Sequence, residues 1–470
     1  MKEKNVSQER AISFGTGPCL VVSGPGSGKT YVITNRIYNL ITRFDIDPRN
    51  ILIITFTHAA ACEMRERFEL LISSKGGRLV NKPIFGTFHS IFYDILRCDF
   101  GYSETSLLTD DEALRYVTRA LEDNNLSNYI NATKALKLIS DFKLVMERDE
   151  DYIPEIIDRR KFLAMYDKYE KLLYENRKLD FYDMIAKCYE LLKQDKKVLA
   201  KYQDRFKYIL IDEFQDINRS QYDLVKLISK TKNIFAVGDD DQSIYSFRGS
   251  MPRVMKDFMN DYNKTTLINL NINYRSRDNI VKLSKAVINH NKKRFKKNLI
   301  AFDKNDGYIE VKKFIDSRDE DLYLIDSINK YKKMGYKLSD MAILYRTNQL
   351  SYTIINDLEK NNIRYRVKTS NDKHFASKED DKNIDSINLM TFHLSKGLEF
   401  KIVYIVDAND NIVPHKKSIK NDDVETERRL FYVAMTRAKT NLHIFVTNRR
   451  FGRVYRTSRF IHEMLGGENG

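Results

Sequence analysis

The chain has 470 residues, of which 42% are hydrophobic, 11% aromatic and 31% charged, so it is not a disordered protein and has room for about two to four globular domains. Its 80 basic and 65 acidic side chains leave a net charge of +15, which favours nucleic acid as the partner. The four cysteines contain no CxxC pair and the uncharged stretch 51–62 is too short to cross a membrane, which favours a cytoplasmic protein without a zinc knuckle, a disulfide framework or a membrane partner.

Short β-branched segments alternate with helical patterns in the first part of the chain, which predicts parallel strands covered by helices. The expected strands of this first series are 19–23, 50–55, 208–211 and 233–237. Between about residues 91 and 200 these segments disappear and apolar residues recur at helical spacing, as in 160–176, so we expect a helical insertion there. A second series of strands is expected at 266–270, 341–345, 387–391, 402–406 and 442–446.

The two series predict an α/β protein with two parallel sheets. We expect the first domain over 1–90 and 201–277, the helical insertion over 91–200, and the second domain over 278–470. The polar, turn-rich stretch 370–383 is predicted to be a loop.

Ten basic residues against three acidic ones give the stretch 281–313 a net charge of +7. This stretch is either a phosphate-binding surface or the solvated face of a helix. The basic residues are Lys282, Lys285, Lys292, Lys293, Arg294, Lys296, Lys297, Lys304, Lys312 and Lys313.

The strongest local motif is SGPGSGKT at 23–30, which follows a predicted strand and precedes a predicted helix, the context of a P-loop. Its glycines would let backbone N–H groups surround phosphate oxygens, Lys29 would reach the β and γ phosphates, and the Thr30 hydroxyl would bind Mg²⁺. Ser23 replaces the first glycine of the strict pattern. The expected phosphate-binding residues are Ser23, Gly24, Pro25, Gly26, Ser27, Gly28, Lys29 and Thr30.

A second acidic site follows the predicted strand 208–211, which ends in Asp212 and Glu213. Asp212 would hold Mg²⁺, directly or through water, and Glu213 would orient and deprotonate the attacking water. Two such acids could also form a solvated turn, but beside a P-loop they favour hydrolysis of ATP or GTP. The residues leave two other functions open: a P-loop ATPase or GTPase that acts on protein partners, and a nucleic-acid-binding protein with a vestigial ATPase site.

Eight further motifs follow one another along the chain. They are TFTHAAACEMRERF (55–68), GTFHS (86–90), IDEFQDIN (211–218), VGDDDQSIYSFRGS (237–250), NYRS (273–276), AILYRTN (342–348), MTFHLSKGLEF (390–400) and ERRLFYVAMTRAK (427–439). With the P-loop, this ordered series resembles the UvrD/Rep/PcrA group of superfamily-one DNA helicases nearly from end to end. The resemblance implies two RecA-like domains with ATP in the cleft between them, and single-stranded DNA across the top.

The resemblance also implies roles around the base and the γ-phosphate. Gln8 would read adenine and Tyr274 would stack on it, while Gln242 would sense the γ-phosphate and couple it to DNA. The family usually has arginine where this chain has Tyr31, so we expect looser selectivity for the base.

Two arginines would reach the phosphates from the second domain by the same resemblance. Arg275 would contact the γ-phosphate and Arg437 would be the other arginine finger. A structural ion pair is the alternative for Arg437. Glu399 would contact the ribose or couple the nucleotide to DNA, with a helix-start glutamate as its alternative.

A strand channel needs flat faces on which bases stack, with hydroxyls, imidazoles and cations that hold phosphates. Phe56 and Phe247 are the first stacking candidates because polar residues flank both. The residues that match the family's strand channel are Phe56, Thr57, Thr87, His89, Tyr245, Phe247, Arg248, Arg346, Thr391, His393 and Lys396. Two further departures bear on this channel: His58 and Ala59 replace Asn and Lys, which removes one phosphate contact, and Phe247 replaces the usual tryptophan.

We expect an ATP- and Mg²⁺-dependent helicase or translocase that moves 3′ to 5′ on single strands, with single-stranded DNA and its junctions with duplex as partners. Relatives carry an accessory subdomain between the motifs that resemble AILYRTN and MTFHLSKG. Here a helix is expected at 349–361 and a strand at 363–368, which leaves only 18 residues, 369–386, too few for a domain of at least ~40 residues. The alternative function is a DNA-stimulated translocase that remodels protein–DNA complexes without processive unwinding and needs a partner protein or self-association.

Overall fold

The structure is a computed structural model that describes residues 5–146, 157–245, 253–369, 384–450 and 452–466. The chain divides into two compact units. The first comprises Met1–Val21, Lys29–Gly238 and Tyr245–Ile268, and the second comprises Val22–Gly28, Asp239–Ile244 and Asn269–Gly470. None of the described helices is both long and apolar enough to cross a membrane.

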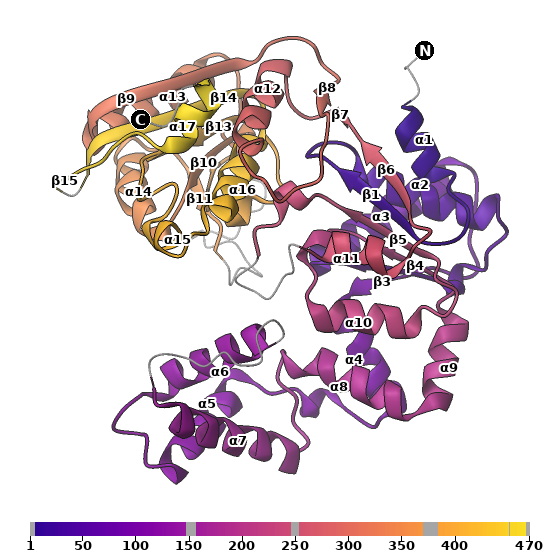
Figure 1. Cartoon of the computed structure of the whole chain (residues 1–470). Coiled ribbons are helices and arrows are strands. Elements are labelled where there is room, and N and C mark those ends of the chain that lie inside the picture. The colour runs from indigo at the N-terminus through magenta and orange to yellow at the C-terminus, as the bar shows by residue number, and fades with distance from the viewer. Residues whose placement is uncertain (1–4, 147–156, 246–252, 370–383, 451, 467–470) are drawn as a thin grey trace. The chain divides into compact units, whose positions relative to one another are not determined.

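A six-stranded sheet forms the core of the first unit (Figure 1). Its strands are β1 (Cys19–Ser23), β2 (Ile51–Thr55), β3 (Ile84–Thr87), β4 (Tyr208–Ile211), β5 (Ile234–Gly238) and β6 (Thr266–Leu270), in the order β3-β2-β4-β5-β1-β6. Strands β1, β2, β4 and β5 are buried along their whole length, as expected for parallel strands covered on both faces. The first predicted series of strands is therefore confirmed.

Two strands of this sheet differ from the prediction. The segment 266–270, expected to open the second series, is β6 and lies beside β1 in the first sheet. Strand β3 pairs in parallel with β2, with Phe85 opposite Ile53, but it was not predicted. Its sequence, Ile-Phe-Gly-Thr, is too short to show an alternating pattern.

The helices of the first unit are α1 (Val6–Ile12), α2 (Lys29–Thr42), α3 (His58–Ser74), α4 (Phe88–Asp99), α5 (Asp110–Asp123), α6 (Ala132–Met146), α7 (Arg159–Glu175), α8 (Asp183–Gln194), α9 (Lys196–Arg205), α10 (Arg219–Ile228) and α11 (Val254–Asp261). The expected helix at 160–176 is confirmed as α7. Helices α5, α6 and α7 share their own apolar cluster around Val117, Phe142, Phe162 and Met165. The helical segment between β3 and β4 thus contains a small core of its own.

The second unit contains another largely parallel sheet. Its strands are β9 (Tyr308–Asp316), β10 (Met341–Tyr345), β11 (Tyr365–Val367), β12 (Ile387–Thr391), β13 (Phe400–Ile405), β14 (Ala438–Arg450) and β15 (Arg453–Val454). The order is β11-β12-β10-β13-β14-β15, and β9 also pairs with β14. A separate pair consists of β7 (Ile272–Asn273) and β8 (Ile300–Ala301). The α/β fold with two parallel sheets is therefore as predicted.

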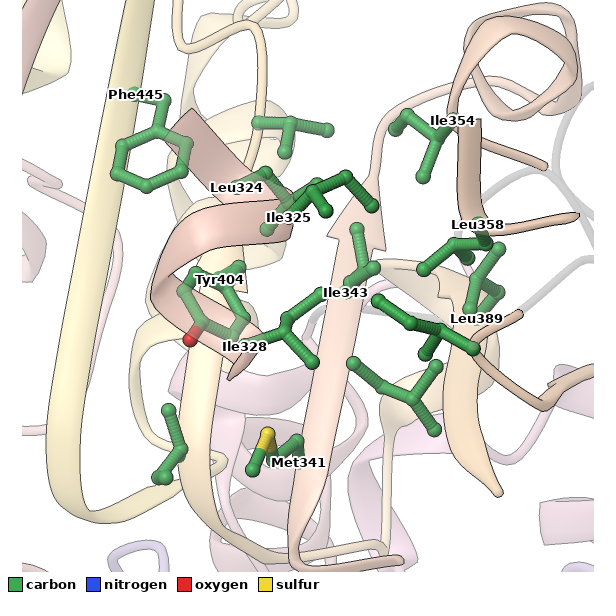
Figure 2. Close-up of a cluster of buried hydrophobic side chains, with 14 of the residues drawn as sticks. Leu324, Ile325, Ile328, Met341, Ile343, Ile354, Leu358, Leu389, Tyr404 and Phe445 are labelled. Carbon is green, nitrogen blue, oxygen red and sulfur yellow. The ribbon is translucent and has the colours of Figure 1, made fainter. Parts of the chain in front are cut away.

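The helices of the second unit are α12 (Asp278–Ile288), α13 (Ser317–Lys333), α14 (Ser351–Lys360), α15 (Lys416–Lys420), α16 (Val424–Met435) and α17 (Arg459–Leu465). Figure 2 shows how α13 and α14 cover the sheet: Leu324, Ile325 and Ile328 of α13 and Ile354 and Leu358 of α14 meet Ile343, Leu389, Tyr404 and Phe445 of the strands. Each fully buried aliphatic side chain of this kind stabilises the fold by about 1.5–3 kcal/mol. This core fixes the ends of β10 and β12, which carry the motifs AILYRTN and MTFHLSKGLEF.

The basic stretch 281–313 is not one helix face. Only its beginning is helical, in α12, and its end, 308–313, is the first two thirds of β9, which pairs in parallel with β14. Lys312 and Lys313 therefore lie in a strand, which hydrophobic periodicity did not predict because charged residues interrupt it.

Strands β11 and β12 are parallel neighbours, with Tyr365 opposite Ile387. The expected helix 349–361 and strand 363–368 are confirmed as α14 and β11, and the predicted loop 370–383 lies outside the described residues.

Candidate nucleotide and single-strand sites

The P-loop runs from the end of β1 to the start of α2, so it leads into a helix N-terminus, whose free backbone N–H groups can bind an anion. Gly26 and Gly28 have φ of +66° and +83°, a region that favours glycine. A Cβ on Gly26 would lie 2.6 Å from Arg275 Cβ, so a side chain there would displace the residue that follows Tyr274. This local geometry fits the phosphate cradle predicted from the sequence.

The predicted lysine and general base meet in the first unit. Lys29 Nζ donates to Glu213 Oε1 at 2.6 Å, and Gln215 Nε2 donates to Glu213 Oε2 at 2.6 Å. Glu213 itself has φ of +51°, a left-handed conformation that turns the chain directly after β4. Asp212 precedes it, and its N–H donates to Ile54 O at 2.9 Å. The two acids thus lie at the carboxyl end of a buried strand, and Glu213 contacts Lys29 of the predicted phosphate site.

The expected γ-phosphate sensor and arginine finger touch each other in the second unit. Arg437 Nη2 donates to Gln242 Oε1 at 3.2 Å, and Gln242 Nε2 donates to Asp239 Oδ2 at 2.6 Å. Arg437 is only 1% exposed, and it also donates to the carbonyl oxygens of Val433 and Leu398. Neutral oxygens therefore orient a buried guanidinium toward Gln242.

The other expected finger is held by a carboxylate. Arg275 Nε donates to Glu399 Oε2 at 2.7 Å, and Lys439 Nζ lies 2.6 Å from Glu399 Oε1. Burial alone would raise the pKa of Glu399, but Lys439 and Arg275 outweigh that effect and the pKa lies below its ordinary value. Glu399 is thus an ionised partner of Arg275, and its predicted contact with ribose stays a prediction.

Two members of the basic stretch 281–313 are internal partners of the GDDDQ motif. Lys297 Nζ lies 2.7 Å from carboxylate oxygens of both Asp240 and Asp241 and also pairs with Asp239, while Arg294 Nη2 lies 2.6 Å from Asp241 Oδ2. The Lys297 side chain is 4% exposed. Buried carboxylates need cations close by, and these two residues provide them for the three aspartates. For Lys297 and Arg294, both interpretations of the stretch, as a phosphate-binding surface and as a solvated helix face, are therefore wrong.

A cavity of about 640 Å³ in the first unit is lined by three of the predicted strand-binding residues. Phe56, Thr57 and His89 line it together with Phe181 and Tyr182, from the turn before α8. The ring of Phe56 stacks on that of Tyr245, with centroids 5.1 Å apart and planes 14° apart. Aromatic faces and hydroxyls therefore surround one hollow, the combination that single-stranded nucleic acid requires.

Phe181 is a residue that the sequence prediction missed. Its ring stacks on His89 at 3.7 Å between centroids, yet 59% of the residue is exposed. The available signal was the sequence Asp180-Phe181-Tyr182-Asp183, in which two aromatic residues lie between acids and fit no apolar helix face. It went unused because the whole segment 91–200 was interpreted only as a helical insertion.

The turn that carries Phe181 is fixed by a buried lysine. Asp180 Oδ1 accepts the N–H groups of Tyr182 and Asp183, both at 2.9 Å, and Asp180 Oδ2 lies 2.7 Å from Lys143 Nζ. Burial opposes the charge of Lys143, but Asp180, Asp183 and Glu170 outweigh it, so the pKa of Lys143 lies above its ordinary value. Lys143 thus positions the aromatic wall of the cavity.

Replacing Phe181 by alanine is expected to weaken binding of single-stranded DNA by about 1–3 kcal/mol, the usual contribution of a base–aromatic stack. Fluorescence anisotropy with labelled oligo-dT would measure this loss. Tyr174→Ala removes another exposed aromatic residue of the same unit and should leave the affinity unchanged. Equal affinities for wild type and Phe181→Ala would remove this residue from the strand site.

The His89 ring is expected to bind in its neutral form. Burial lowers the pKa of His89 to about 4, so the imidazole stays uncharged as pH falls from about 8 to 5.5. The ratio of the DNA dissociation constants of His89→Gln and wild type should therefore be constant over this range. A ratio that grows toward acid pH would show that a protonated His89 holds phosphate.

The remaining predicted strand contacts have varied surroundings. Thr57 and Thr87 cap the N-termini of α3 and α4. Arg346 forms a bidentate pair with the buried Glu427, and Lys396 Nζ donates to the Gln242 carbonyl at 2.8 Å. Contact of these residues with DNA stays a prediction, as it does for Thr391, the last residue of β12, and for His393, which begins the short 3-10 helix after it. Phe247 and Arg248 lie outside the described residues.

Comparison with known proteins decides the family. A model of the UvrD/REP helicase N-terminal domain matches residues 4–263, which is more than half of the chain. The chain belongs to the UvrD/REP helicase family. A model of the UvrD-like helicase C-terminal domain matches residues 268–379 and 372–449. The two matched domains of this UvrD/REP chain are those of an ATP-hydrolysing helicase, and the two parallel sheets agree with two RecA-like domains.

Two named relatives show how the UvrD/REP chain compares in length. It is 29% identical over 621 aligned residues to YjcD of Bacillus subtilis, named as a candidate ATP-dependent DNA helicase, and the match covers 98% of this chain and 81% of YjcD. It is 36% identical over 375 residues to the ATP-dependent DNA helicase PcrA of Staphylococcus epidermidis and of Staphylococcus aureus. The PcrA matches cover 78% of this chain and 51% of PcrA, so the chain spans about half the length of those relatives.

Proposed function

We propose that this chain is an ATP-dependent DNA motor that moves 3′ to 5′ along single strands and separates duplex ahead of it. The observation that carries the proposal is the pair of Lys29 and Glu213 at 2.6 Å, because it joins a phosphate-binding cation to a carboxylate able to act on water. Family membership and the names of the relatives supply the substrates, ATP and DNA.

Hydrolysis would use the following groups of the chain. Lys29 would bind the β and γ phosphates, and Glu213 would then accept a proton from the attacking water. Arg437 and Arg275 would stabilise the charge that develops on the γ-phosphate, and Gln242, in contact with Arg437, would respond to its loss. Arg275 must exchange Glu399 for phosphate to do so.

The residues also fit a divalent cation. Thr30 follows Lys29 at the start of α2, and Asp212 directly follows β4, so a hydroxyl oxygen and a carboxylate are available as ligands. Mg²⁺ held by Thr30 and Asp212 would neutralise phosphate charge during hydrolysis.

Strand binding would use the aromatic cavity of the first unit. Bases would stack on Phe56 and Phe181, and the hydroxyl of Thr57 would hold the backbone. Stacking does not read base edges, which suits a motor that moves along any sequence.

The alternative, a motor that remodels protein–DNA complexes and needs a partner to unwind, is favoured by the connection between β11 and β12. The C-terminal family model matches in two pieces that meet at 372–379, inside this connection. The alignment with YjcD spans 621 positions although this chain has 470 residues, so the relative contains residues that this chain lacks. We propose that the missing part is the accessory subdomain, and that this motor translocates without its regulation.

Steady-state ATPase with and without poly-dT is the primary test, and strong stimulation is expected. Unwinding of 3′-tailed duplex but not of 5′-tailed duplex would support the direction. Lys29→Ala should abolish both activities. Hydrolysis without any response to poly-dT would favour an ATPase that acts on protein partners.

Single-turnover unwinding at increasing protein concentration separates the two motor functions. Unwinding that appears only at several copies per duplex, or only with an added partner, would support the remodelling motor. Processive unwinding by one monomer would contradict the need for a partner.

A further inference from the structure

Two aromatic side chains of the second unit touch each other and yet remain exposed. Tyr274 is 42% and Phe302 is 50% exposed, and their ring centroids are 5.0 Å apart. Single exposed aromatic residues are ordinary on protein surfaces. A contacting pair that leaves half of its surface open is instead suited to a flat ligand, because aromatic rings bind other rings by their faces and edges.

A short ladder fixes the position of both rings. Strands β7 and β8 pair in parallel with Asn273 opposite Ala301, and Tyr274 and Phe302 are the residues that directly follow each strand. Phe302 N donates to Asn273 O at 2.8 Å. Leu299 and Ala301 are buried, so the strand that leads to Phe302 is anchored while the Phe302 ring remains outside.

The chain after Phe302 is anchored as well. Asp303 Oδ2 lies 2.7 Å from Arg277 Nη1, and Asp303 Oδ1 accepts the N–H of Asn305 at 3.0 Å. The backbone on both sides of Phe302 is therefore held, which limits how far its ring can move away from Tyr274.

The same ladder packs on the P-loop. Tyr274 N donates to Gly26 O at 2.9 Å, and Asn273 Nδ2 donates to Pro25 O at 2.9 Å. A Cβ on Gly24 would lie 2.5 Å from Leu299 Cδ1, so this glycine too is in direct contact with the ladder. Both rings therefore lie beside the loop that would hold the phosphates of a nucleotide.

We propose that Phe302 is a positioning residue for the base of the bound nucleotide: it holds the Tyr274 ring so that the base stacks on it. The proposal rests on the proposed function, since it requires a nucleotide at the P-loop. The family resemblance places Tyr274 at the base, and the contact seen here adds Phe302 to that role. The ligand class is a nucleoside triphosphate. The affinity of its base-free analogue, inorganic tripolyphosphate, should not depend on Phe302.

The test uses the full chain and equilibrium binding of the fluorescent nucleotide mant-ATP with Mg²⁺, so it does not depend on turnover. Phe302→Ala should weaken mant-ATP about 2- to 10-fold, the range of one aromatic contact, and Phe302→Tyr should restore binding. The competition constant of tripolyphosphate should stay the same in both. Tyr352→Ala, which removes an exposed aromatic residue of the same unit, is the matched control and should bind like wild type.

Steady-state kinetics give the second reading, in which KM for ATP rises in Phe302→Ala while kcat stays the same. Unchanged mant-ATP affinity, or an equal loss for tripolyphosphate, would overturn the proposal, because the latter would mean a disturbed P-loop. If Phe302→Ala does not fold, Phe302→Leu, which keeps apolar volume without a ring, should show the same loss. A wild-type chain that binds mant-ATP but does not hydrolyse ATP would defeat the proposed function and leave this binding test valid. Failure of wild type to bind mant-ATP would overturn both.

Discussion

Glu213→Gln is expected to reduce kcat for ATP hydrolysis by about 10²- to 10⁴-fold, the usual contribution of a general base. The amide keeps the size of the side chain and can still accept a hydrogen bond from Lys29, but it cannot take a proton from water. ATP binding should therefore survive, and saturating poly-dT should not restore turnover. Steady-state hydrolysis and mant-ATP binding, measured on the same preparation, would show the two effects separately.

Two comparisons make this result specific to Glu213. Lys29→Ala should weaken ATP binding itself, because it removes the cation that we propose binds the phosphates. Glu190→Gln changes an exposed glutamate of the same unit and should behave like wild type. Hydrolysis by Glu213→Gln at close to the wild-type rate would show that another group is the base.

Lys143→Met is expected to destabilise the helical insertion by about 3–5 kcal/mol, the cost of removing one partner from a buried ion pair. The Lys143 side chain is 5% exposed and pairs with Glu170, Asp180 and Asp183, which would be left together without a cation. Urea unfolding followed by circular dichroism would measure the loss. Lys168→Met breaks a half-exposed pair with Asp123 and should cost less than about 1 kcal/mol.

The pH dependence of this loss gives an independent check. Burial raises the pKa of Glu170 and raises that of Asp183 to about 7, and Lys143 opposes both shifts, so the loss of Lys143 raises these two pKa values further. A group whose folded pKa is raised contributes stability at low pH and loses it as pH rises. The difference in unfolding free energy between wild type and Lys143→Met should therefore grow as pH rises through about 7, the pKa of Asp183 when Lys143 is present. A difference that does not change with pH would mean that packing, not charge, is what Lys143 provides.

Local chemistry explains which features could be predicted from the sequence. Buried strands such as 51–55 and 341–345 are uninterrupted apolar runs, and the P-loop has a fixed spacing between a strand and a helix. Each of these patterns lies within a few consecutive residues, so it can be recognised without knowledge of the fold. Strand β9 was missed because Lys312 and Lys313 interrupt its pattern, although pairing with β14 holds it in the sheet.

The partners of charged and exposed residues could not be predicted in this way. Lys297 meets the aspartates of the GDDDQ motif across more than fifty residues of sequence, and Phe181 meets His89 across about ninety. No local sequence pattern links the two members of either pair. The sequence can show that a residue is charged or aromatic, but only the fold shows whether it contacts another part of the protein or remains open to a ligand.

In the second unit, Gln242 contacts one residue of the predicted phosphate site and one residue of the predicted strand site. Its side chain accepts from Arg437, which belongs to the predicted phosphate site, and its carbonyl accepts from Lys396, which belongs to the predicted strand site. A free energy of coupling that passes through one residue is reciprocal by thermodynamic necessity. If single-stranded DNA raises the affinity for ATP through Gln242 by some factor, ATP must raise the affinity for DNA by the same factor. Gln242→Ala must then remove both effects together.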